Sequence, residues 1–431
     1  MSGDEGIVAA VDADALLGPR FAALPPLSLY VHIPWCIRKC PYCDFNSHEW
    51  RGSPASETLP EDAYVDALIA DLESALPGIW GRKVGTVFIG GGTPSLFSVA
   101  SIERFLSAVR ARVPLLPDAE VTLEANPGTF ERTKFAGFFA AGVNRLSLGV
   151  QSFDDRFLRA LGRVHDADEA RRAAESALMI FGNVNLDLMF ALPGQTVDDA
   201  RRDVAIALSL APPHLSFYHL TLEPNTLFHR YPPSLPDDEV AADIEDAVLG
   251  MLAQGSYEHY ETSAHAKAGY RCRHNVNYWR FGDYLGIGAG AHSKLSFADR
   301  VVRQLRWKQP SQYLEQAARG APLQEEMNVS RRELPFEFML NALRLADGVP
   351  ASLFAERTGL PISAATRAIA DAARKGLLEP NPTILKPTPL GRRFLNDLQA
   401  LFLAESPRDP TRAMARRVVP ADAVRGPVAR P

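Results

Sequence analysis

Leu29-Tyr-Val-His-Ile33-Pro-Trp-Cys36-Ile-Arg-Lys-Cys40-Pro-Tyr-Cys43 joins an apolar strand-like run to three closely spaced cysteines. The chain of 431 residues has only 4 cysteines, too few for a disulfide scaffold. In a reducing compartment, cysteines this close together indicate zinc or an iron-sulfur cluster, because both select soft sulfur ligands. A zinc site would need a fourth ligand, and the nearby candidates are His32 and His48.

Beyond this segment, apolar runs alternate with amphipathic ones. Strands are predicted at residues 29–33, 86–89, 120–124, 145–150, 185–190 and 214–220. Helices are predicted between them, at residues 62–76, 99–112, 131–141, 167–180 and 198–210. This alternation predicts an α/β fold with a parallel sheet, open or partly closed into a barrel, whose functional site lies at the carboxyl ends of the strands.

The chain divides into segments of different composition. Residues 1–27 have no clear period and are predicted to be a loose lead-in to a core at residues 28–236. Residues 237–330 are predicted to extend this core, with a helix at 238–254 and an aromatic segment after it. Residues 331–403 form short apolar helices that resemble a winged-helix module, whose weak, mixed charge favours packing or docking over DNA binding. The proline- and arginine-rich residues 404–431 are predicted to be a disordered tail.

The composition is that of a soluble globular protein of two or three domains, with 46% hydrophobic and 23% charged residues. A net charge of -5 argues against a dedicated nucleic-acid binder. The longest uncharged stretch near the start of the fold, residues 84–102, is interrupted by glycine, threonine, serine and proline, so no membrane-spanning helix is expected. Acidic residues precede the first basic residue, Arg20, which is the opposite of a secretory signal, and a cytoplasmic location is therefore expected.

The C-x3-C-x2-C spacing of Cys36, Cys40 and Cys43, directly after the first strand, resembles the radical S-adenosylmethionine (SAM) superfamily. This resemblance implies that the three thiolates hold three irons of a [4Fe-4S] cluster, and that the fourth iron binds the amino and carboxylate groups of SAM. The cluster then passes an electron to the sulfonium and breaks a C–S bond. Tyr42, just before the last cysteine, fits a residue that packs on the adenine.

Further polar motifs follow the predicted strands. Gly90-Gly-Gly-Thr-Pro94 lets the backbone approach a ligand, although a triple glycine can also be a simple turn. Glu124, Gln151 and Asp187 end or interrupt apolar strands, where a carboxylate is costly unless it is paired or faces a ligand. Sheet-end hydrogen bonds are the alternative explanation. Arg163 offers a fork for a ligand carboxylate, or alternatively makes a surface ion pair.

Residues 29–400 resemble the oxygen-independent coproporphyrinogen III oxidase group. The segments that carry this likeness are 29–36, 149–152 and 185–193. The resemblance implies a partly open (β/α)6 barrel, followed by the smaller, mainly helical C-terminal domain. It also implies a set of SAM-site residues, namely Tyr30, Gly91, Gly92, Thr93, Glu124, Gln151, Arg163 and Asp187.

Two features separate this chain from the oxidases of that group. The oxidases have a fourth cysteine two positions after the third, where this chain has Phe45, and a longer N-terminal extension than the roughly 35 residues that precede Cys36 here. Cys272-Arg-His274-Asn-Val-Asn-Tyr-Trp279 is similar to the HNxxYW motif of the heme chaperone (HemW) family, which shares the three-cysteine cluster. The alternative is a core hairpin in which His274 bonds to a carbonyl group.

An imidazole is a normal axial ligand of heme iron, and aromatic rings can stack on a porphyrin. The resemblance therefore implies that His274 binds heme, while Cys272, His265 and His292 stay open as ligands. The predicted function is a cytoplasmic radical SAM heme chaperone in porphyrin metabolism, either free or peripheral to the membrane. Its cofactors would be a [4Fe-4S] cluster, SAM and heme.

The expected partners of such a chaperone are hemoprotein acceptors, such as membrane respiratory proteins, and an electron donor for the cluster. A homodimer is a further expectation, and nucleic acid is not an expected partner. The first alternative function is the oxidase, which decarboxylates two propionates, and the second is a zinc-stabilised α/β protein without radical chemistry. Whether SAM is cleaved is left open.

Overall fold

The computed structural model describes residues 19–52, 58–128 and 131–403. Most of the predicted lead-in and all of the predicted tail, residues 1–18 and 404–431, lie outside the described residues. No helix in the described ranges is long and apolar enough to cross a membrane.

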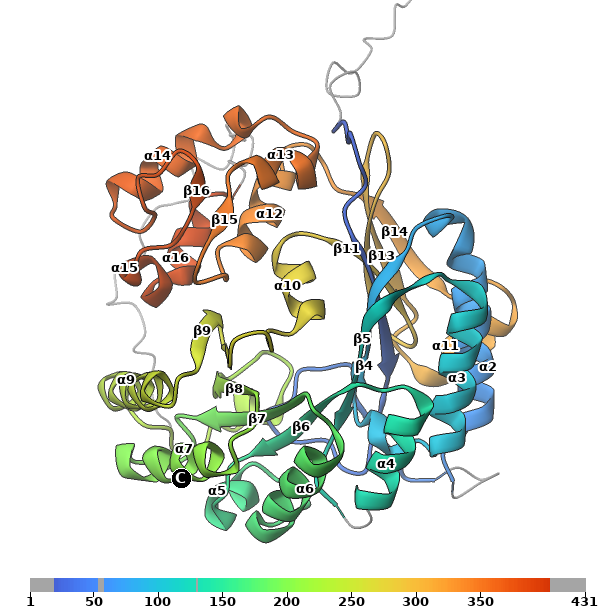
Figure 1. Ribbon diagram of the computed structural model, residues 1–431, viewed down its shortest axis with the longest axis vertical. Coiled ribbons are helices and arrows are strands. Elements are labelled where there is room, and N and C mark those ends of the chain that lie inside the picture. Colours follow the sequence, from blue (N-terminus) through green and yellow to red (C-terminus); the bar gives the residue numbers. More distant parts are fainter. Residues whose placement is uncertain (1–18, 53–57, 129–130, 404–431) are drawn as a thin grey trace, which may run out of the picture.

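A large open sheet forms the centre of the molecule (Figure 1). Its middle consists of parallel strands that lie side by side in chain order: β1 (Leu27–Ile33), β4 (Val84–Gly91), β5 (Leu115–Ala125), β6 (Arg145–Gln151), β7 (Val184–Phe190) and β8 (His214–His219). The helices that connect them are α2 (Glu61–Ala75), α3 (Val99–Arg112), α4 (Glu131–Ala141), α5 (Asp155–Ala160), α6 (Ala167–Ile180) and α7 (Val197–Leu210). The α/β prediction is confirmed.

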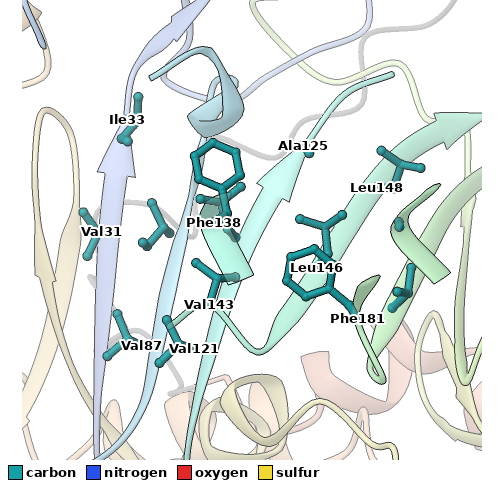
Figure 2. Close-up of a cluster of buried hydrophobic side chains, with 14 of the residues drawn as sticks. Val31, Ile33, Val87, Val121, Ala125, Phe138, Val143, Leu146, Leu148 and Phe181 are labelled. Carbon is teal, nitrogen blue, oxygen red and sulfur yellow. The ribbon is translucent and has the colours of Figure 1, made fainter. Parts of the chain in front are cut away.

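These strands are buried on both faces, as expected of a parallel sheet covered by other elements. One face is apolar, and the other carries buried polar side chains such as Ser28, Thr86 and Ser147. In β6, every residue except the last is buried. Figure 2 shows Val31, Val87, Val121 and Leu146 from neighbouring strands beside Phe138 of α4. Each Å² of apolar surface buried here stabilises the folded state by about 25 cal/mol. This packing keeps the carboxyl ends of the strands in a fixed arrangement.

Strands from the predicted extension complete both edges of the sheet, which has 12 strands in the described residues. Beyond β1 lie β11 (Asp283–Ile287), which is parallel to it, and then the antiparallel strands β12 (His292–Ser296), β13 (Val301–Arg306) and β14 (Leu323–Asn328). Beyond β8 lie β10 (Ala264–Ala266) and β9 (Glu258–Glu261). Because β14 and β9 do not pair with each other in the described residues, the core is open and not a closed barrel.

The extension also contributes helices. The predicted helix at 238–254 is α9 (Asp238–Gln254), and α10 (Arg273–Trp279) and α11 (Pro310–Ala318) were not predicted. The short helix α8 (Leu227–Arg230), also not predicted, lies before the extension, near the end of the core. Residues 35–49 after β1 contain only the short strands β2 (Trp35–Cys36) and β3 (His48–Glu49), which pair with each other.

The C-terminal residues pack around a hydrophobic cluster of their own, which includes Phe338, Phe354 and Leu398. Its elements are α12 (Leu334–Ala342), α13 (Ser352–Thr358), α14 (Thr366–Arg374), α15 (Pro389–Arg393), α16 (Leu395–Ala400) and the two short paired strands β15 (Val349–Pro350) and β16 (Ile384–Leu385). Short helices with a small hairpin agree with the predicted winged-helix-like module. Trp279 at the end of α10 packs against this cluster, so α10 lies between the module and the sheet (Figure 1).

Candidate functional site: two adjoining cavities

The three clustered cysteines lie in the loop that follows β1, at the carboxyl end of the parallel strands. Cys36 ends β2, and the amide of Cys43 donates to the carbonyl oxygen of Cys40 (N–O 3.2 Å), which closes a turn. All three thiols are free and partly buried. They line a cavity of about 410 Å³, the first cavity below.

Each thiol of this cluster has at least one polar neighbour. Thr93 Oγ1 donates to Cys36 Sγ (3.4 Å), Arg163 Nη1 donates to Cys40 Sγ (3.6 Å), and Cys43 Sγ lies 3.5 Å from Ser47 Oγ. Burial raises the pKa of Cys36 to about 11, and burial also raises the pKa of Cys43. Thiols held protonated in this way ionise when a metal centre supplies positive charge, so the donor set suits metal ligation.

The surroundings of the thiols distinguish a cluster from zinc. The Nδ1 of His32 bonds to Tyr30 Oη (2.9 Å) and its Nε2 bonds to the carbonyl oxygen of Asn46 (3.0 Å). His48 Nε2 is likewise 3.3 Å from Asn46 Oδ1. Within the described ranges, no group of three or more His, Cys, Asp or Glu side chains converges closely enough for a single metal ion. Three sulfur donors without a histidine to complete a tetrahedron fit a [4Fe-4S] cluster better than structural zinc.

The glycine-rich edge of β4 forms the next part of the first cavity. Gly91 has φ +114°, and a Cβ there would lie 2.6 Å from the His32 ring. A Cβ at Gly92 would lie 2.6 Å from the carbonyl oxygen of Trp35. Both positions therefore require glycine, and they bring the backbone close to the cysteine loop.

Two carboxyl groups line the same cavity from β5 and β7. Glu124 Oε2 accepts from the amide of Gly91 (3.0 Å), while Asp187 accepts from Ser147 Oγ and from Asn185 Nδ2 (2.8 Å each). Burial, with repulsion from Asp187, raises the pKa of Glu124 to about 8, and burial also raises the pKa of Asp187. The cavity therefore holds carboxyl groups that can both accept and donate hydrogen bonds near neutral pH.

Arg163 is held between the cysteine loop and the sheet. Its Nη2 donates to Asn126 Oδ1 (2.6 Å) and to the carbonyl oxygen of Gly149 (2.8 Å). Its Nε is buried and has no hydrogen-bond partner in the part of the chain that the structure describes. The alternative of a surface ion pair for Arg163 is wrong, because this residue lines the first cavity.

Asn126 completes a chain of hydrogen bonds that the sequence analysis missed. Its Nδ2 donates to Thr93 Oγ1 (2.9 Å), and its Oδ1 accepts from Arg163. Together with the contacts to the thiols, this links Cys36 to Cys40 through Thr93, Asn126 and Arg163. The sequence did contain a signal for Asn126. In Glu124-Ala-Asn126-Pro this residue directly follows an apolar strand, as several of the predicted site residues do.

Most of the predicted site residues meet at the first cavity. They are Cys36, Cys40, Tyr42, Cys43, Gly91, Gly92, Thr93, Glu124, Gln151, Arg163 and Asp187. Ser147 and Tyr218 line it as well and were not predicted. Tyr30 and His274 lie elsewhere, on the wall of a second cavity.

The second cavity is larger, about 1090 Å³, and it adjoins the first, because Cys43, Asp44, Phe45, Gly91 and Glu124 line both. It lies where β1, β4, α10, β12 and β13 approach one another. Aromatic side chains form much of its wall: Tyr30, Phe88, Tyr278, Trp279 and Tyr284.

His274 stands in the first turn of α10, with its ring 5.0 Å from the ring of Phe88. Its Nδ1 is 2.8 Å from Thr86 Oγ1, and the Thr86 hydroxyl donates to Ser28 Oγ (2.8 Å). The Thr86 oxygen therefore accepts from Nδ1–H, and Nε2 carries the lone pair. Burial lowers the pKa of His274 to about 3, so the ring is neutral at physiological pH.

Two of the other candidate heme ligands do not line this cavity. Cys272 is fully buried and donates to Glu120 Oε1 (3.6 Å). His265 is buried on β10 and stacks on His259, with ring centroids 4.5 Å apart. His292 lines the second cavity together with His274. The alternative of a core hairpin at His274 is wrong, since the segment is a helix and its imidazole bonds to a hydroxyl group.

Comparison with known proteins identifies the family. A radical SAM superfamily model matches residues 30–205, and a HemN C-terminal domain model matches residues 329–394. Heme chaperone HemW of Escherichia coli (strain K12) is 47% identical over 384 residues, which cover 89% of this chain and 99% of that protein. The chain belongs to the HemW family. HemW of Bacillus subtilis (strain 168) is 33% identical over 386 residues, covering 88% of this chain and 99% of that protein.

A solved structure supports the same fold for this HemW-family chain. Coproporphyrinogen III oxidase (HemN) from Escherichia coli, a radical SAM enzyme, is similar with a TM-score of 0.74 and 25% identity, over 88% of this chain and 90% of that chain. The position that held the fourth cysteine in the oxidase pattern is Phe45 here, an exposed side chain that lines both cavities. The HNxxYW segment of this chain forms α10 beside the second cavity.

Proposed function

We propose that the chain is a heme chaperone that binds a [4Fe-4S] cluster and SAM in the first cavity and heme in the second, and then transfers heme to hemoproteins. The observation that carries this proposal is the neutral imidazole of His274, with its Nε2 lone pair, on the wall of an aromatic cavity that adjoins the three thiols. Relatives named heme chaperone HemW support it.

In the first cavity, Cys36, Cys40 and Cys43 would ligate the cluster, which when bound supplies an electron to the SAM sulfonium. The carboxyl groups of Glu124 and Asp187 would bind the amino and hydroxyl groups of SAM. The guanidinium of Arg163 would attract the SAM carboxylate, and its bonds to Asn126 and Gly149 keep it in place. Tyr42 and Gln151 line the same cavity and would contact the rest of the ligand.

In the second cavity, His274 would bind the heme iron. The bond from its Nδ1–H to Thr86 would fix the tautomer and the ring orientation, as outer-shell partners do for other metal-bound histidines. The rings of Tyr30, Phe88 and Tyr278 would pack against the porphyrin. His292 is the second candidate ligand in this cavity.

Several parts of this function rest on the family resemblance alone. We infer a cytoplasmic protein, free or peripheral to the membrane, with an electron donor for the cluster and hemoprotein acceptors that include membrane respiratory proteins. A homodimer and the cleavage of SAM stay predictions.

The oxidase is the second candidate function, and the TM-score of 0.74 to HemN favours it. Phe45 is evidence against it, because this exposed aromatic side chain, which lines both cavities, takes the place of the fourth cysteine.

The deciding experiment is anaerobic reconstitution of the cluster, followed by two parallel assays on the same sample. One assay titrates heme and follows its Soret band. The other adds coproporphyrinogen, SAM and a reductant, with HemN as the positive control. We expect saturable heme binding and no consumption of coproporphyrinogen. Turnover comparable to that of HemN would replace the chaperone with the oxidase, and a failure to bind heme would reject the proposal.

A further inference from the structure

The second cavity has a basic wall as well as an aromatic one. Lys39, Arg303 and Lys308 all line it. Arg303 is already engaged, because it forms an ion pair with Glu337 and donates to Tyr284 Oη (2.6 Å). In the described part of the chain, neither lysine has a carboxylate within ion-pair distance.

The segment that follows the cysteine loop contacts both lysines, Lys39 through its side chain and Lys308 through its backbone. Lys39 Nζ donates to the carbonyl oxygen of Phe45 (3.2 Å), and Asn46 Nδ2 donates to the carbonyl oxygen of Lys308 (2.9 Å). His292, on the same wall, has its pKa lowered first by burial and then by the charges of Lys308 and Arg303. Positive charge therefore accumulates at this part of the cavity.

This basic region lies apart from His274 along the cavity wall. Tyr30, whose ring centroid is 6.5 Å from that of His274, bonds to His32 Nδ1. His32 Nε2 bonds to the carbonyl oxygen of Asn46, whose amide reaches Lys308. A row of three hydrogen-bonded residues thus separates the imidazole from the lysine.

A heme has its iron at the centre of the ring and both of its carboxylates on one edge. With the iron at His274 and the ring against the aromatic wall, one edge can extend toward Lys39 and Lys308. We propose that this lysine pair binds the propionate carboxylates of the porphyrin, an inference that rests on the proposed heme site.

The other charged groups of the cavity set the strength of this interaction. Asp44 and Glu325 also line it, and they reduce the positive potential, while Glu124 with its raised pKa is largely uncharged at neutral pH. Because Lys39 and Lys308 are exposed, each contact with a carboxylate is expected to strengthen binding only about 2- to 5-fold. The contribution should also fall as salt is added.

The test compares iron protoporphyrin with its dimethyl ester, which keeps the iron and the ring but has no carboxylate charge. Both are titrated into wild type, Lys308→Gln, Lys39→Gln and the double variant, all without a reconstituted cluster. We expect wild type to prefer the free acid, each single variant to lose about 2- to 5-fold of that preference, and the double variant to lose most of it, with ester binding unchanged. Lys83→Gln, at the opposite end of β4, is the matched control.

Glu325→Gln gives a change of opposite sign, since it removes a negative charge from the cavity and should raise the preference for the free acid. If wild type and the lysine variants bind acid and ester equally, the lysine assignment is wrong and the heme site stands. If neither compound binds wild type, the proposed heme function itself is rejected. Inorganic phosphate that abolishes the preference at low millimolar concentration would mean that the lysines bind small anions in general, and it would overturn the assignment.

Discussion

The two cavities share a border but are built in different ways. The first is formed by short motifs, each at the carboxyl end of a parallel strand, and its polar groups are linked from Cys36 to Cys40 by hydrogen bonds. The second draws its wall from β1, β4, α10, β12 and β13, and it is aromatic with a basic region. Adjacent sites in one molecule can therefore differ in how far the sequence alone reveals them.

The chemistry of the two cavities differs in the same way. The first holds buried carboxyl groups whose pKa values are raised, and thiols that need a metal to ionise. The second holds a neutral imidazole with a pKa of about 3, beside aromatic rings and exposed lysines. If the cavities serve different ligands, a substitution in one should leave the ligand of the other in place.

The largest effect is expected from Cys40→Ala. Two thiolates cannot hold three irons, so the reconstituted protein should lose nearly all of its iron and sulfide. Heme affinity should stay within about twofold of wild type, an energy change below about 0.5 kcal/mol. Metal analysis and a Soret titration on the same sample measure both quantities. Cys272→Ala is the control, since this buried thiol bonds to Glu120 and does not line the first cavity; loss of the cluster in that variant alone would contradict the assignment.

The reciprocal substitution is His274→Ala. If this imidazole ligates the iron, heme binding should weaken by at least about tenfold, or about 1.4 kcal/mol, and the Soret band should shift. Iron and sulfide content should not change. Thr86→Val leaves the imidazole in place but removes the acceptor of Nδ1–H, and should give a smaller loss than His274→Ala. Normal affinity in the alanine variant would move the ligand to His292, which lines the same cavity.

The sequence predicted the elements of the first cavity because a local rule applied there. Glu124 and Asp187 sit in or at the end of apolar strands, and parallel strands bring such residues to the same edge. The same rule would have found Asn126. It could not find Tyr218, since β8 is the last strand of the series and its exposed end resembles any polar strand terminus.

The second cavity escaped prediction for a different reason. Its basic wall depends on β11 pairing with β1 and on β12 and β13 following it. The contacts of β1 and the loop after it with this part of the chain join residues more than 240 positions apart, as in the bond from Asn46 to the carbonyl of Ala289. No local periodicity encodes such a pairing. Only the resemblance to the HNxxYW motif pointed to His274, and the structure adds that Tyr30, expected among the SAM residues, lies on the same wall.

A smaller effect is expected from Asn126, within the first cavity. Asn126→Ala leaves Thr93 without its donor and Arg163 without one acceptor, at an expected cost of about 1–3 kcal/mol. Asn126→Asp keeps the acceptor for Arg163 and loses only the donor to Thr93. The change in the EPR spectrum of the reduced cluster on adding SAM should weaken in the alanine variant and less in the aspartate variant. Equal, undiminished spectral changes in both would show that the hydrogen-bonded chain does not position the SAM site.

The smallest effect is expected in the pH dependence of protein stability, to which the two cavities should contribute differently. The pKa of Glu124 is about 8 in the folded protein and lies near 4.5 when the chain is unfolded. The folded state therefore binds more protons between these values, so this group stabilises the protein at low pH and the stabilisation is lost as pH rises through about 8. Asp187, whose pKa is also raised, acts in the same direction.

Thermal unfolding of the protein without cluster at pH 6 and pH 9 tests this difference. Wild type should lose more stability between pH 6 and pH 9 than Glu124→Gln, which has no charge to bury.

His274 should have the opposite effect on the pH dependence of stability. Because its pKa is lowered to about 3, the unfolded state binds the extra proton between about pH 3 and pH 6.5. The stability that depends on this group therefore rises with pH in that range and is nearly constant above it. His274→Ala should consequently keep most of the wild-type decline between pH 6 and pH 9. An equal decline in wild type and Glu124→Gln would mean that the first cavity does not hold its carboxyl group protonated, and the contrast between the two cavities would then rest on their ligands alone.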